Sequence, residues 1–344
     1  MNPKELHVLY ISGNDFMPYT GISIESLFKN NKSFTDIHLH LFDRGIDKSN
    51  KSKIIKLCEK HKRTIHFYDI TDSKFKEILN DQTLDKLNMV TSINTLSKLL
   101  ISEIIPESIE KILYIDADSL VLGSLNDLWE TDIANYHFSA TEDLAVLSTF
   151  PEIKRMIGLN KNEIYVNAGI MLINLNKWRE DNVKVNFITF LENNKSKYMD
   201  QDVFNGTLDK IMIIPLEYNV LPPFFEFLYK FFKHSNIKSY YSDEEIENSI
   251  NNPIIFHFAN SNIVPRPWFK GKLFEIGRYF SKKNVKKNKY KDYMNIYSEY
   301  IADSMWSDSA YINDQRSYMG QILYVLSFIP LFSTISIYIY KKLK

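Results

Sequence analysis

Cysteine is nearly absent from this chain of 344 residues: Cys58 is the single one, so no internal disulfide can form and no Cys/His cluster indicates a structural zinc site. An excess of one charge sign is also lacking, because 42 basic residues balance 42 acidic ones, which excludes a strong overall field for nucleic acid. No basic stretch followed by an apolar run comes after Met1, so no signal peptide is predicted. A reducing compartment fits these absences best, and the predicted location is the cytoplasm.

Short apolar runs alternate with amphipathic stretches over the first 135 residues, a pattern typical of parallel strands joined by helices. The spacing of apolar residues predicts strands over 7–12, 36–43, 64–70 and 111–119, and helices over 21–30, 49–62 and 92–105. This order indicates an α/β nucleotide-binding fold. Ligands of such folds bind at the carboxyl ends of the strands, so polar residues there are the first candidates for a site.

Beyond residue 136 the alternation is less regular. Loops and a helix beginning near Asp200 separate further predicted strands over 137–143, 169–175, 211–218 and 253–260. We expect these strands to complete the same sheet or to form a small sheet beside it.

The composition changes after a predicted catalytic domain over 1–280, and the remaining segment is 281–344. Residues 281–291 carry six lysines and are expected to be a basic surface segment. Residues 322–340 carry no charge, but Pro330 and several hydroxyl side chains interrupt the run. Tyrosines and flanking lysines suit a headgroup boundary, so peripheral attachment at the inner face of the plasma membrane is the preferred interpretation. A helix packed on the domain and a single span are the alternatives.

The sharpest local feature is an apolar strand that ends in Asp116 and Asp118. Residues two apart on an extended chain point to the same face, so both carboxylates can contact one cation. Oxygen ligands suit magnesium or manganese, ions that keep open positions for substrate phosphates. An Asp-x-Asp pair by itself also occurs in solvated turns, so the preceding strand is what makes the pair indicate phosphate chemistry.

Five segments in order resemble the successive motifs of family 8 glycosyltransferases, which include bacterial lipopolysaccharide galactosyl- and glucosyltransferases and glycogenin. They lie within roughly residues 6–270 and read YISGNDFMPYTGISIESL, LYIDADSLVLGSLNDLW, VNAGIMLINLNKW, MDQDVFNG and HFANSNIVPRPW. The resemblance implies a GT-A fold with a mixed central sheet flanked by helices. It further implies a UDP-sugar donor, a manganese ion with magnesium as the alternative, and retention of the anomeric configuration.

On this resemblance Asp116, Asp118 and His257 would hold the manganese ion, and Asp116 would also lie near the donor ribose. A histidine in an apolar strand is more often structural, so the family context carries the assignment of His257. Two carboxylates and one imidazole make a chemically consistent divalent site that leaves positions open for both donor phosphates. The ion would stabilise the departing diphosphate as negative charge develops on it.

The resemblance also assigns contacts to the donor. Arg266 stands where the family has a lysine that contacts the diphosphate, at a longer spacing from His257 than expected, and arginine can bind phosphate through two hydrogen bonds. Lys98 falls where the family has an arginine near the donor sugar, and a helical surface lysine is the alternative. The remaining donor-binding residues are Ser12 and Asp15 in the amino-terminal motif, and Asn167 and Ala168 at the floor of the sugar site.

Three residues are assigned to the reacting sugar: Asp200 to its hydroxyls, Gln201 beside the anomeric carbon, and Asp143 as a nearby carboxylate. Asp200 also fits a helix N-cap, which needs no further role. Retention through a covalent intermediate requires a carboxylate nucleophile, whereas Gln201 is an amide. The hypothesis is therefore a same-face substitution in which the leaving phosphate oxygen helps to deprotonate the acceptor hydroxyl.

Two other functions fit part of the sequence. An apolar strand ending in Asp-x-Asp also begins haloacid-dehalogenase phosphatases, although there it lies near the start of the domain, and His257 would be unexplained. A non-catalytic sugar-nucleotide-binding module is the other. Acceptor contacts are expected within residues 218–250, where FFEFLYKFF supplies aromatic faces. The choice of glucose or galactose and the acceptor, a saccharide or lipid-linked oligosaccharide, stay open.

Overall fold

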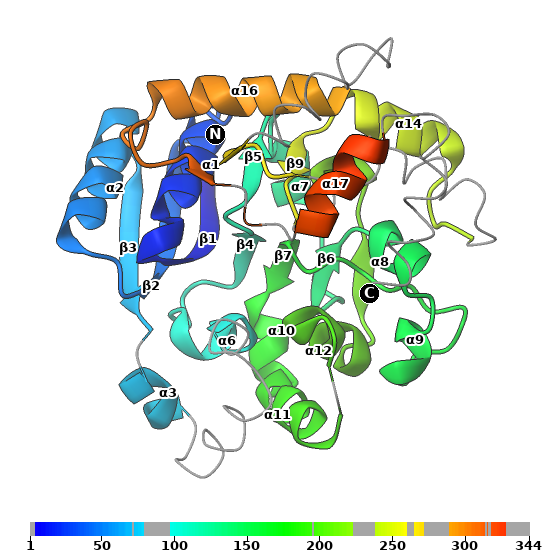
Figure 1. Ribbon diagram of the computed structural model, residues 1–344. Helices are drawn as coiled ribbons and strands as arrows, with labels where there is room; N and C mark the ends of the chain where they lie inside the picture. The colour runs from blue at the N-terminus through cyan, green and yellow to red at the C-terminus, as the bar shows by residue number, and fades with distance from the viewer. Residues whose placement is uncertain are drawn as a thin grey trace.

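The first three strands form one parallel layer in the computed structural model (Figure 1), which describes residues 4–70, 72–78, 97–194, 196–222, 238–259, 265–271, 289–313, 315 and 318–327. They are β1 (Glu5–Gly13), β2 (Asp36–Arg44) and β3 (Thr64–Asp69). β2 lies between β1 and β3 and is parallel to both, which confirms the three strands predicted from the sequence.

Two helices follow the first two strands. A 3-10 turn, η1 (Asn14–Phe16), leads into α1 (Met17–Asn30), which begins before the predicted residue 21 because Pro18 fits the first helical turn. α2 (Lys48–His61) begins after Asp47, whose side chain accepts a hydrogen bond from the backbone of Asn50. Both predicted helices are confirmed.

The helix predicted over 92–105 is wrong as one continuous element within the described residues. α3 (Asp72–Ile78) precedes this segment, and residues 92–96 lie outside the described part of the chain. Residues 97–99 form a helical turn, a break follows at Leu100, and α6 (Ile101–Ile104) is a single turn. The break lets Lys98 face the interior, as described below.

The strand predicted over 111–119 is two strands. β4 (Lys111–Ile115) belongs to the central sheet, whereas β5 (Ser119–Val121) pairs antiparallel with β9 (Ile255–His257) in a separate two-stranded sheet. A turn at residues 117–118 separates them. The small sheet beside the main one is thus present, and it brings His257 next to Ser119 in register.

The later strands of the main sheet are shorter than predicted. They are β6 (Phe138–Ala140), β7 (Ile170–Asn174) and β8 (Ile211–Ile213). Helices connect and flank them: α7 (Asn126–Glu130), α8 (Leu144–Thr149), α9 (Ile153–Met156), α10 (Leu175–Glu180), α11 (Val183–Asn193), α12 (Met199–Thr207), η2 (Leu216–Tyr218) and α14 (Asp243–Asn251). The helix predicted near Asp200 is confirmed as α12.

The main sheet is mixed, with the strand order β3-β2-β1-β4-β7-β6-β8. β1 and β4 are parallel neighbours, while β7 runs antiparallel to both β4 and β6. The chain leaves β1 toward β2 and β3 on one side and returns to β4 on the other, so the order reverses between β1 and β4. This switch point is where ligands bind in open α/β sheets.

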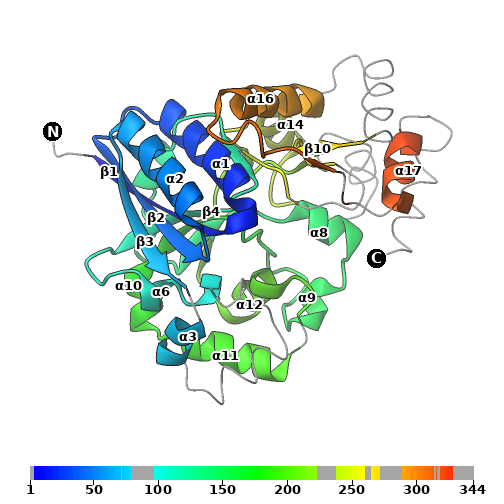
Figure 2. The same ribbon diagram turned by 60° about the vertical axis from the view of Figure 1, so that its left-hand side comes forward.

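Helices lie on both faces of the sheet (Figures 1 and 2). Leu6, Val8 and Tyr10 of β1 pack with α1 and α2, whereas Leu9 and the strands β4 and β7 contribute to a second core that includes α10, α11 and α12. These alternating sides follow the period of two along a strand. Because β1 and β4 contribute side chains to both cores, packing on both faces of the sheet holds these two strands in place.

Part of the carboxyl-terminal region packs on the same body. α16 (Lys289–Asp303) contributes Tyr297 and Ile301 to a third core beside α1, and the indole nitrogen of Trp306 donates to Asn50 Oδ1 at 2.7 Å. β10 (Phe269–Lys270) pairs with β11 (Ile312–Asn313), and α17 (Tyr318–Ser327) is the last described element. The boundary at residue 280 stays a prediction, since residues 272–288 lie outside the described part.

No helix among the described residues is both long and apolar enough to cross a bilayer. Most of the apolar run predicted over 322–340 lies outside them, as do most of the lysine-rich segment over 281–291 and the aromatic segment FFEFLYKFF. The peripheral attachment of the tail and the acceptor role of the aromatic segment stay predictions.

Candidate active site

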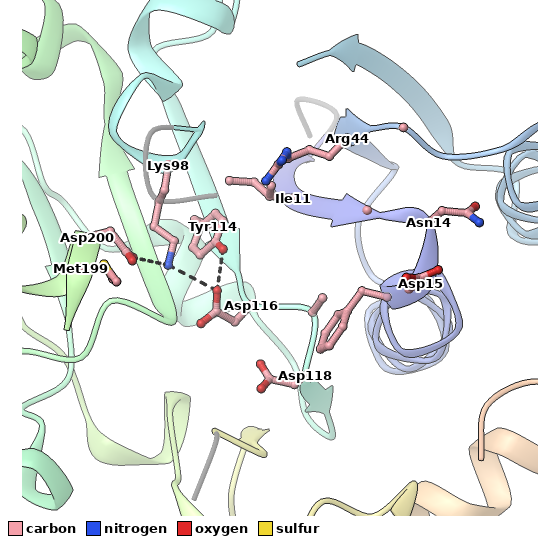
Figure 3. A pocket seen from close by; sticks show the side chains of 14 residues that line it. Ile11, Asn14, Asp15, Arg44, Lys98, Tyr114, Asp116, Asp118, Met199 and Asp200 are labelled. Carbon is pink, nitrogen blue, oxygen red and sulfur yellow. Dashed lines mark hydrogen bonds and ion pairs between the residues drawn. The ribbon is translucent and has the colours of Figure 1, made fainter. Parts of the chain in front are cut away.

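A cavity of about 760 Å³ opens at the switch point of the sheet (Figure 3). Its wall is made by residues that follow β1, β2 and β4 and by the start of α12, including Asn14, Asp15, Arg44, Asp116 and Asp200. The sequence predicts polar residues at strand ends as the site, and this is where the cavity lies.

The acid cluster, which we define as Asp116, Asp118 and His257, lies at this cavity. His257 Nε2 is 3.6 Å from Asp116 Oδ2 and 3.3 Å from Asp118 Oδ1. One ligand atom from each residue lies within 4.8 Å of those of the other two. Two carboxylates and an imidazole at these separations fit a hard or borderline divalent cation.

Gly169 is the residue that makes this convergence possible. A Cβ atom at Gly169 would lie 2.2 Å from His257 Cε1 and 2.9 Å from Asp116 Oδ2. The backbone is held on both sides, since Gly169 N donates to Asn167 Oδ1 at 2.9 Å and Gly169 O accepts from Asp116 N at 2.7 Å. Any side chain there would displace two of the three groups of the acid cluster.

A buried amide network orients the imidazole. Asn219 Oδ1 is 3.0 Å from His257 Nδ1, and Asn219 Nδ2 donates to Asn167 Oδ1 at 2.8 Å. Because the amide oxygen of Asn219 accepts, His257 carries a proton on Nδ1, and its Nε2 faces the two carboxylates, where it donates to Asp118 when protonated and can bind a cation when neutral. Such outer contacts fix the tautomer of a metal-binding histidine.

The same network reaches the residues assigned to the sugar. Asp143 Oδ2 accepts from Asn167 Nδ2 at 2.8 Å and from Gln201 Nε2 at 2.9 Å, and Asp143 Oδ1 caps α8 through Val146 N. Gln201 Oε1 in turn accepts from Ala168 N at 3.1 Å. Asp143 is buried, and its contacts hold the Gln201 amide in one orientation.

Lys98 is buried rather than on a helix surface. Its ammonium group lies 2.7 Å from Asp200 Oδ2 and 3.4 Å from Asp116 Oδ1, and it donates to Ala168 O at 3.1 Å (Figure 3). Although burial disfavours its charge, Asp116 and Asp200 raise the pKa of Lys98. The helical surface alternative for Lys98 is therefore wrong, and a fixed positive charge lies beside the acid cluster.

Asp116 and Asp118 have different electrostatic surroundings. Burial raises the pKa of Asp116, which the charges of Lys98 and His257 offset only in part. At Asp118, burial also opposes ionisation, but the guanidinium of Arg266, 2.9 Å away, and the hydrogen bond from His257 lower the pKa to about 2. Asp118 is thus the more strongly held carboxylate.

Arg266 reaches Asp118 despite the longer spacing from His257 in the sequence. Its guanidinium lies over the rings of Trp268, at 5.2 Å, and Phe16, at 5.8 Å. Trp268 is itself buried and stacks on Tyr19 at 4.2 Å. Two aromatic residues therefore hold a cation at the edge of the acid cluster.

The two aspartates of the Met-Asp-Gln-Asp segment do different things. Asp200 lies in the first turn of α12 and points to Lys98, while the N-cap is Tyr198 and no side chain caps the helix, so the N-cap interpretation of Asp200 is wrong. Asp202 is fully buried and accepts hydrogen bonds from Tyr165 OH and the backbone of Lys197 and Tyr198. Asp200 thus faces the cavity, and Asp202 fixes the turn that precedes it.

The two amino-terminal residues assigned to the donor are in different positions. Asp15 lines the cavity, whereas the Ser12 hydroxyl is buried, 2.8 Å from the Thr20 hydroxyl, and is not among the cavity-lining side chains. Asn14, Arg44, Tyr114 and Asn219 were not predicted. Of these four residues, Arg44 could have been predicted from the sequence, because it is a basic residue directly after the predicted strand DIHLHLFD.

Tyr114 lies two residues before Asp116, at the end of β4, and contacts its carboxylate. Its hydroxyl donates to Asp116 Oδ1 at 2.5 Å, and its ring lies 4.5 Å from the Lys98 ammonium (Figure 3). Nothing in the sequence separates Tyr114 from an ordinary core tyrosine, because only the pairing of β4 with β1 and β7 aims it at the cavity.

Comparisons with known proteins agree with this geometry. The model of the family described as "Glycosyl transferase family 8" matches residues 7–271, a span that includes the whole acid cluster. A candidate glycosyltransferase of Haemophilus influenzae is 34% identical over 64% of this chain and 64% of its own length, so this chain spans just under two thirds of that relative. A lipopolysaccharide 1,2-glucosyltransferase of Escherichia coli is 24% identical over 79% of each chain.

Among solved structures, the galactosyltransferase LgtC in complex with donor and acceptor sugar analogs aligns with a TM-score of 0.66 at 23% identity, covering 88% of this chain and all of that one. At this identity the likeness shows the shared fold. The family match covers most of the chain and confirms the resemblance of the five motifs, so the chain belongs to glycosyl transferase family 8.

Proposed function

We propose that the chain is a retaining hexosyltransferase that moves glucose or galactose from a UDP-sugar to an acceptor saccharide in cell-surface polysaccharide or lipopolysaccharide synthesis. The observation that carries this proposal is the convergence of Asp116, Asp118 and His257 at a cavity, with two cations beside them, the buried Lys98 and the partly buried Arg266. A site with carboxylates for a divalent ion and cations for phosphate matches a nucleotide diphosphate donor.

Asp116, Asp118 and His257 would hold Mn²⁺, with Mg²⁺ as the alternative, because their ligand atoms lie within one coordination shell and Gly169 leaves the space between them open. When bound, the ion supplies Lewis-acid stabilisation of the charge on the diphosphate. Arg266 binds the same diphosphate from the opposite side, where its guanidinium can form two hydrogen bonds to phosphate oxygens.

The sugar end of the donor lies toward α12. Asp200 and Lys98 together bind sugar hydroxyls, because the carboxylate accepts and the ammonium donates at the same edge of the cavity. Asn167 and Ala168 form the floor behind them. Asp15 reaches the ribose or uracil at the other end, next to Asn14 and Arg44, which line the same cavity.

Gln201 is held beside Ala168 by two hydrogen bonds, so its amide presents a fixed dipole rather than a nucleophile. We therefore retain a same-face substitution: the glycosidic bond to the diphosphate breaks, the acceptor oxygen bonds to the anomeric carbon on the same face, and the acceptor proton passes to the leaving phosphate oxygen. Asp143 acts on this step through Gln201, as a positioning residue.

The acceptor is proposed from the relatives. The E. coli relative is a lipopolysaccharide 1,2-glucosyltransferase, and LgtC is a galactosyltransferase. A saccharide or lipid-linked oligosaccharide at the cytoplasmic face of the membrane fits both, with the basic tail as the means of peripheral attachment. The phosphatase alternative has no support from the family match.

The test is release of UDP from a panel of UDP-sugars with Mn²⁺, comparing the natural chain with Asp118→Asn. We expect slow, metal-dependent hydrolysis of one sugar nucleotide, and a loss of about 10³-fold or more in kcat/KM in the variant, because Asp118 contacts His257 and Arg266 as well as the metal position. Asp303→Asn is the matched control, since Asp303 is an exposed carboxylate near Lys29.

Hydrolysis of a phosphomonoester without UDP release would contradict the proposal and support the phosphatase alternative. Equal UDP release by the natural chain and Asp118→Asn would contradict the assignment of the site. An inverted product anomer, measured by NMR after transfer to an acceptor, would reject the same-face substitution while leaving the donor class intact.

A further inference from the structure

Four histidines gather at the amino-terminal ends of β1, β2 and β3, far from the acid cluster. They are His7, His38, His40 and His66, which we call the histidine cluster. In register, His7 pairs with His38 and His40 pairs with His66, and the two pairs of rings stack at 4.7 and 4.9 Å. His7 is four positions before Ile11, the nearest residue of β1 that lines the cavity, or about 13 Å along the strand.

A hydrogen-bond chain orients the ring of His7. His7 Nδ1 lies 3.0 Å from His40 Nε2, and His40 Nδ1 lies 2.9 Å from the hydroxyl of Tyr68. When His7 Nδ1 donates to His40 Nε2 and His40 Nδ1 donates to the Tyr68 hydroxyl oxygen, the Nε2 atom of His7 carries a lone pair. An imidazole held by its second nitrogen in this way is the usual form of a metal ligand.

His38 is oriented from the other side. Its Nδ1 lies 3.4 Å from His66 Nε2, while its Nε2 is buried and has no hydrogen-bond partner. That Nε2 lies 3.6 Å from Glu5 Oε2 and 3.6 Å from Asp36 Oδ2. A bare imidazole lone pair facing two carboxylates is repulsive, so a cation at this point would relieve the contact.

The distances match a metal coordination shell. One ligand atom each from Glu5, His7 and His38 lies within 4.8 Å of the other two. In a tetrahedral zinc site, two ligands at about 2.1 Å from the ion are separated by about 3.4 Å, close to the separation of His38 Nε2 from each carboxylate. The side chain of Glu5 is 49% exposed, which leaves the position open to solvent ions.

We propose that Glu5, His7 and His38 form a second metal site, for a transition-metal ion of the zinc, nickel and copper class, that links the starts of β1 and β2. Imidazole with carboxylate selects this class over Mg²⁺ and Ca²⁺, which prefer all-oxygen ligands. Asp36 is a hydrogen-bonded neighbour of this site, since its Oδ2 accepts from the Thr64 hydroxyl at 2.5 Å and its Oδ1 from Ile37 N at 2.7 Å. The site is structural and independent of glycosyl transfer.

A proton on His38 Nε2 is the competing explanation, because an imidazolium would also satisfy Glu5 and Asp36. The hydrogen-bond chain from His7 to Tyr68 brings a second imidazole to the same position, where one of its ring nitrogens lies within 4.8 Å of the ligand atoms of Glu5 and His38. Protonation would involve His38 alone and would give His7 no role, whereas a metal ion would be bound by both imidazoles.

The experiment is equilibrium dialysis of the untagged full chain against Zn²⁺ at pH 7.5. We expect the His257→Ala variant, which lacks the acid-cluster ligand, to bind one Zn²⁺ per chain, and His257→Ala with His38→Gln to bind none. Cu²⁺ bound to the His257→Ala variant should show nitrogen coupling in its EPR spectrum that is lost with His38→Gln. His61→Gln is the matched control, because His61 lies on α2 beside Glu25 and outside the histidine cluster.

Glu5→Gln keeps the proposal testable if His38→Gln unfolds, since Glu5 is half-exposed and its loss leaves the core intact. We expect Zn²⁺ affinity to fall at least tenfold in Glu5→Gln with the unfolding temperature of the metal-free chain unchanged. No Zn²⁺ bound to His257→Ala, or equal binding by His38→Gln and its parent, would overturn the proposal and leave the imidazolium explanation. Donor hydrolysis is expected to be the same in His38→Gln and the natural chain.

Discussion

Each end of the parallel strands carries a group of three potential metal ligands among the described residues, but the two groups have different environments. At the carboxyl ends, Asp116, Asp118 and His257 are enclosed by Lys98, Arg266 and a buried amide network. At the amino ends, Glu5, His7 and His38 lie at a rim that solvent reaches, and histidine rings are their main neighbours. The acid cluster has neighbouring cations and a cavity, which suit the proposed phosphorylated substrate. The group at the amino ends suits the proposed metal ion.

The same difference separates the supporting residues. Around the acid cluster, Asn167, Asn219, Asp143 and Gln201 bond to one another through directed hydrogen bonds. Around the histidine cluster, stacking positions the rings, and the hydrogen bonds are a chain from His7 through His40 to Tyr68 and a contact between His38 and His66. We therefore expect substitutions at the carboxyl ends to change the reaction steeply, and those at the amino ends to change stability and ion binding modestly.

The largest effect is expected from Gly169→Ala. The added methyl group would lie 2.2 Å from His257 Cε1, and both backbone groups of Gly169 are bonded, so the acid cluster must move apart. We expect kcat/KM for donor hydrolysis to fall by about 10³-fold, with overpacking costing about 1–3 kcal/mol in the free energy of unfolding. Kinetics with Mn²⁺ and denaturant unfolding measure both.

Gly123→Ala is the control for that substitution. Its methyl group would meet side-chain atoms of Ile254 at 3.3 Å, which can shift, and Ile254 Cα at 3.5 Å, an ordinary van der Waals contact. If Gly169→Ala kept its activity within a few fold, the three residues of the acid cluster could move apart without loss of function. That result would contradict the expectation that substitutions at the carboxyl ends change the reaction steeply.

Asp200→Asn and Asp202→Asn form the second test. Asp200 faces the cavity beside Lys98, so we expect its substitution to lower kcat by about 10²-fold with little change in unfolding temperature. Asp202 is bonded to Tyr165 and two backbone amides, so its substitution should lower stability by about 1–3 kcal/mol. If Asp202→Asn reduced kcat more than Asp200→Asn at a temperature where both are folded, the division of roles would be wrong.

A third, smaller effect is expected from Asn219→Ala, which removes the acceptor of His257 Nδ1. Mn²⁺ affinity, followed by EPR titration, should fall by about 10–100-fold, and saturating Mn²⁺ should restore much of kcat. Asn205→Ala is the control for metal affinity, because Asn205 is a similarly buried amide that bonds the backbone of Val166 and Gln201 rather than the His257 imidazole. Unchanged Mn²⁺ affinity in Asn219→Ala, or an equal loss in the control, would show that the amide does not orient the imidazole.

The smallest effect concerns pH and the histidine cluster in the presence of a chelator. Burial, followed by the charges of neighbouring histidines, lowers the pKa of His7 to about 4 and that of His40 to about 3, whereas an unfolded histidine titrates near 6.5. Between these values the unfolded chain binds more protons, so stability present above about pH 6.5 is lost as the pH falls. The free energy of unfolding should decrease by up to about 1.4 kcal/mol per pH unit for each histidine.

The His7→Gln variant sharpens this prediction, because it removes one titrating ring at a half-buried position. Denaturant unfolding between pH 7 and pH 5 should give a shallower pH dependence for His7→Gln than for the natural chain. Parallel curves for the two proteins would mean that His7 does not titrate with folding.

The sequence by itself determined the α/β class, the first three strands, the two helices between them and the two carboxylates of the acid cluster. These features depend on local signals: apolar periodicity sets each element, and a strand that ends in Asp-x-Asp keeps both carboxylates within reach of one ion. The family resemblance added His257, whose strand alone has no distinguishing pattern, and the comparisons confirmed that family.

Only the tertiary structure decided which side chains meet. The pairing of β5 with β9 brings His257 to Asp118, the break after residue 99 turns Lys98 inward, and the burial of the Ser12 hydroxyl removes it from the cavity wall. The histidine cluster likewise exists only because three strands align in register. Contacts between residues far apart in the chain depend on strand order and register, which local propensities do not encode.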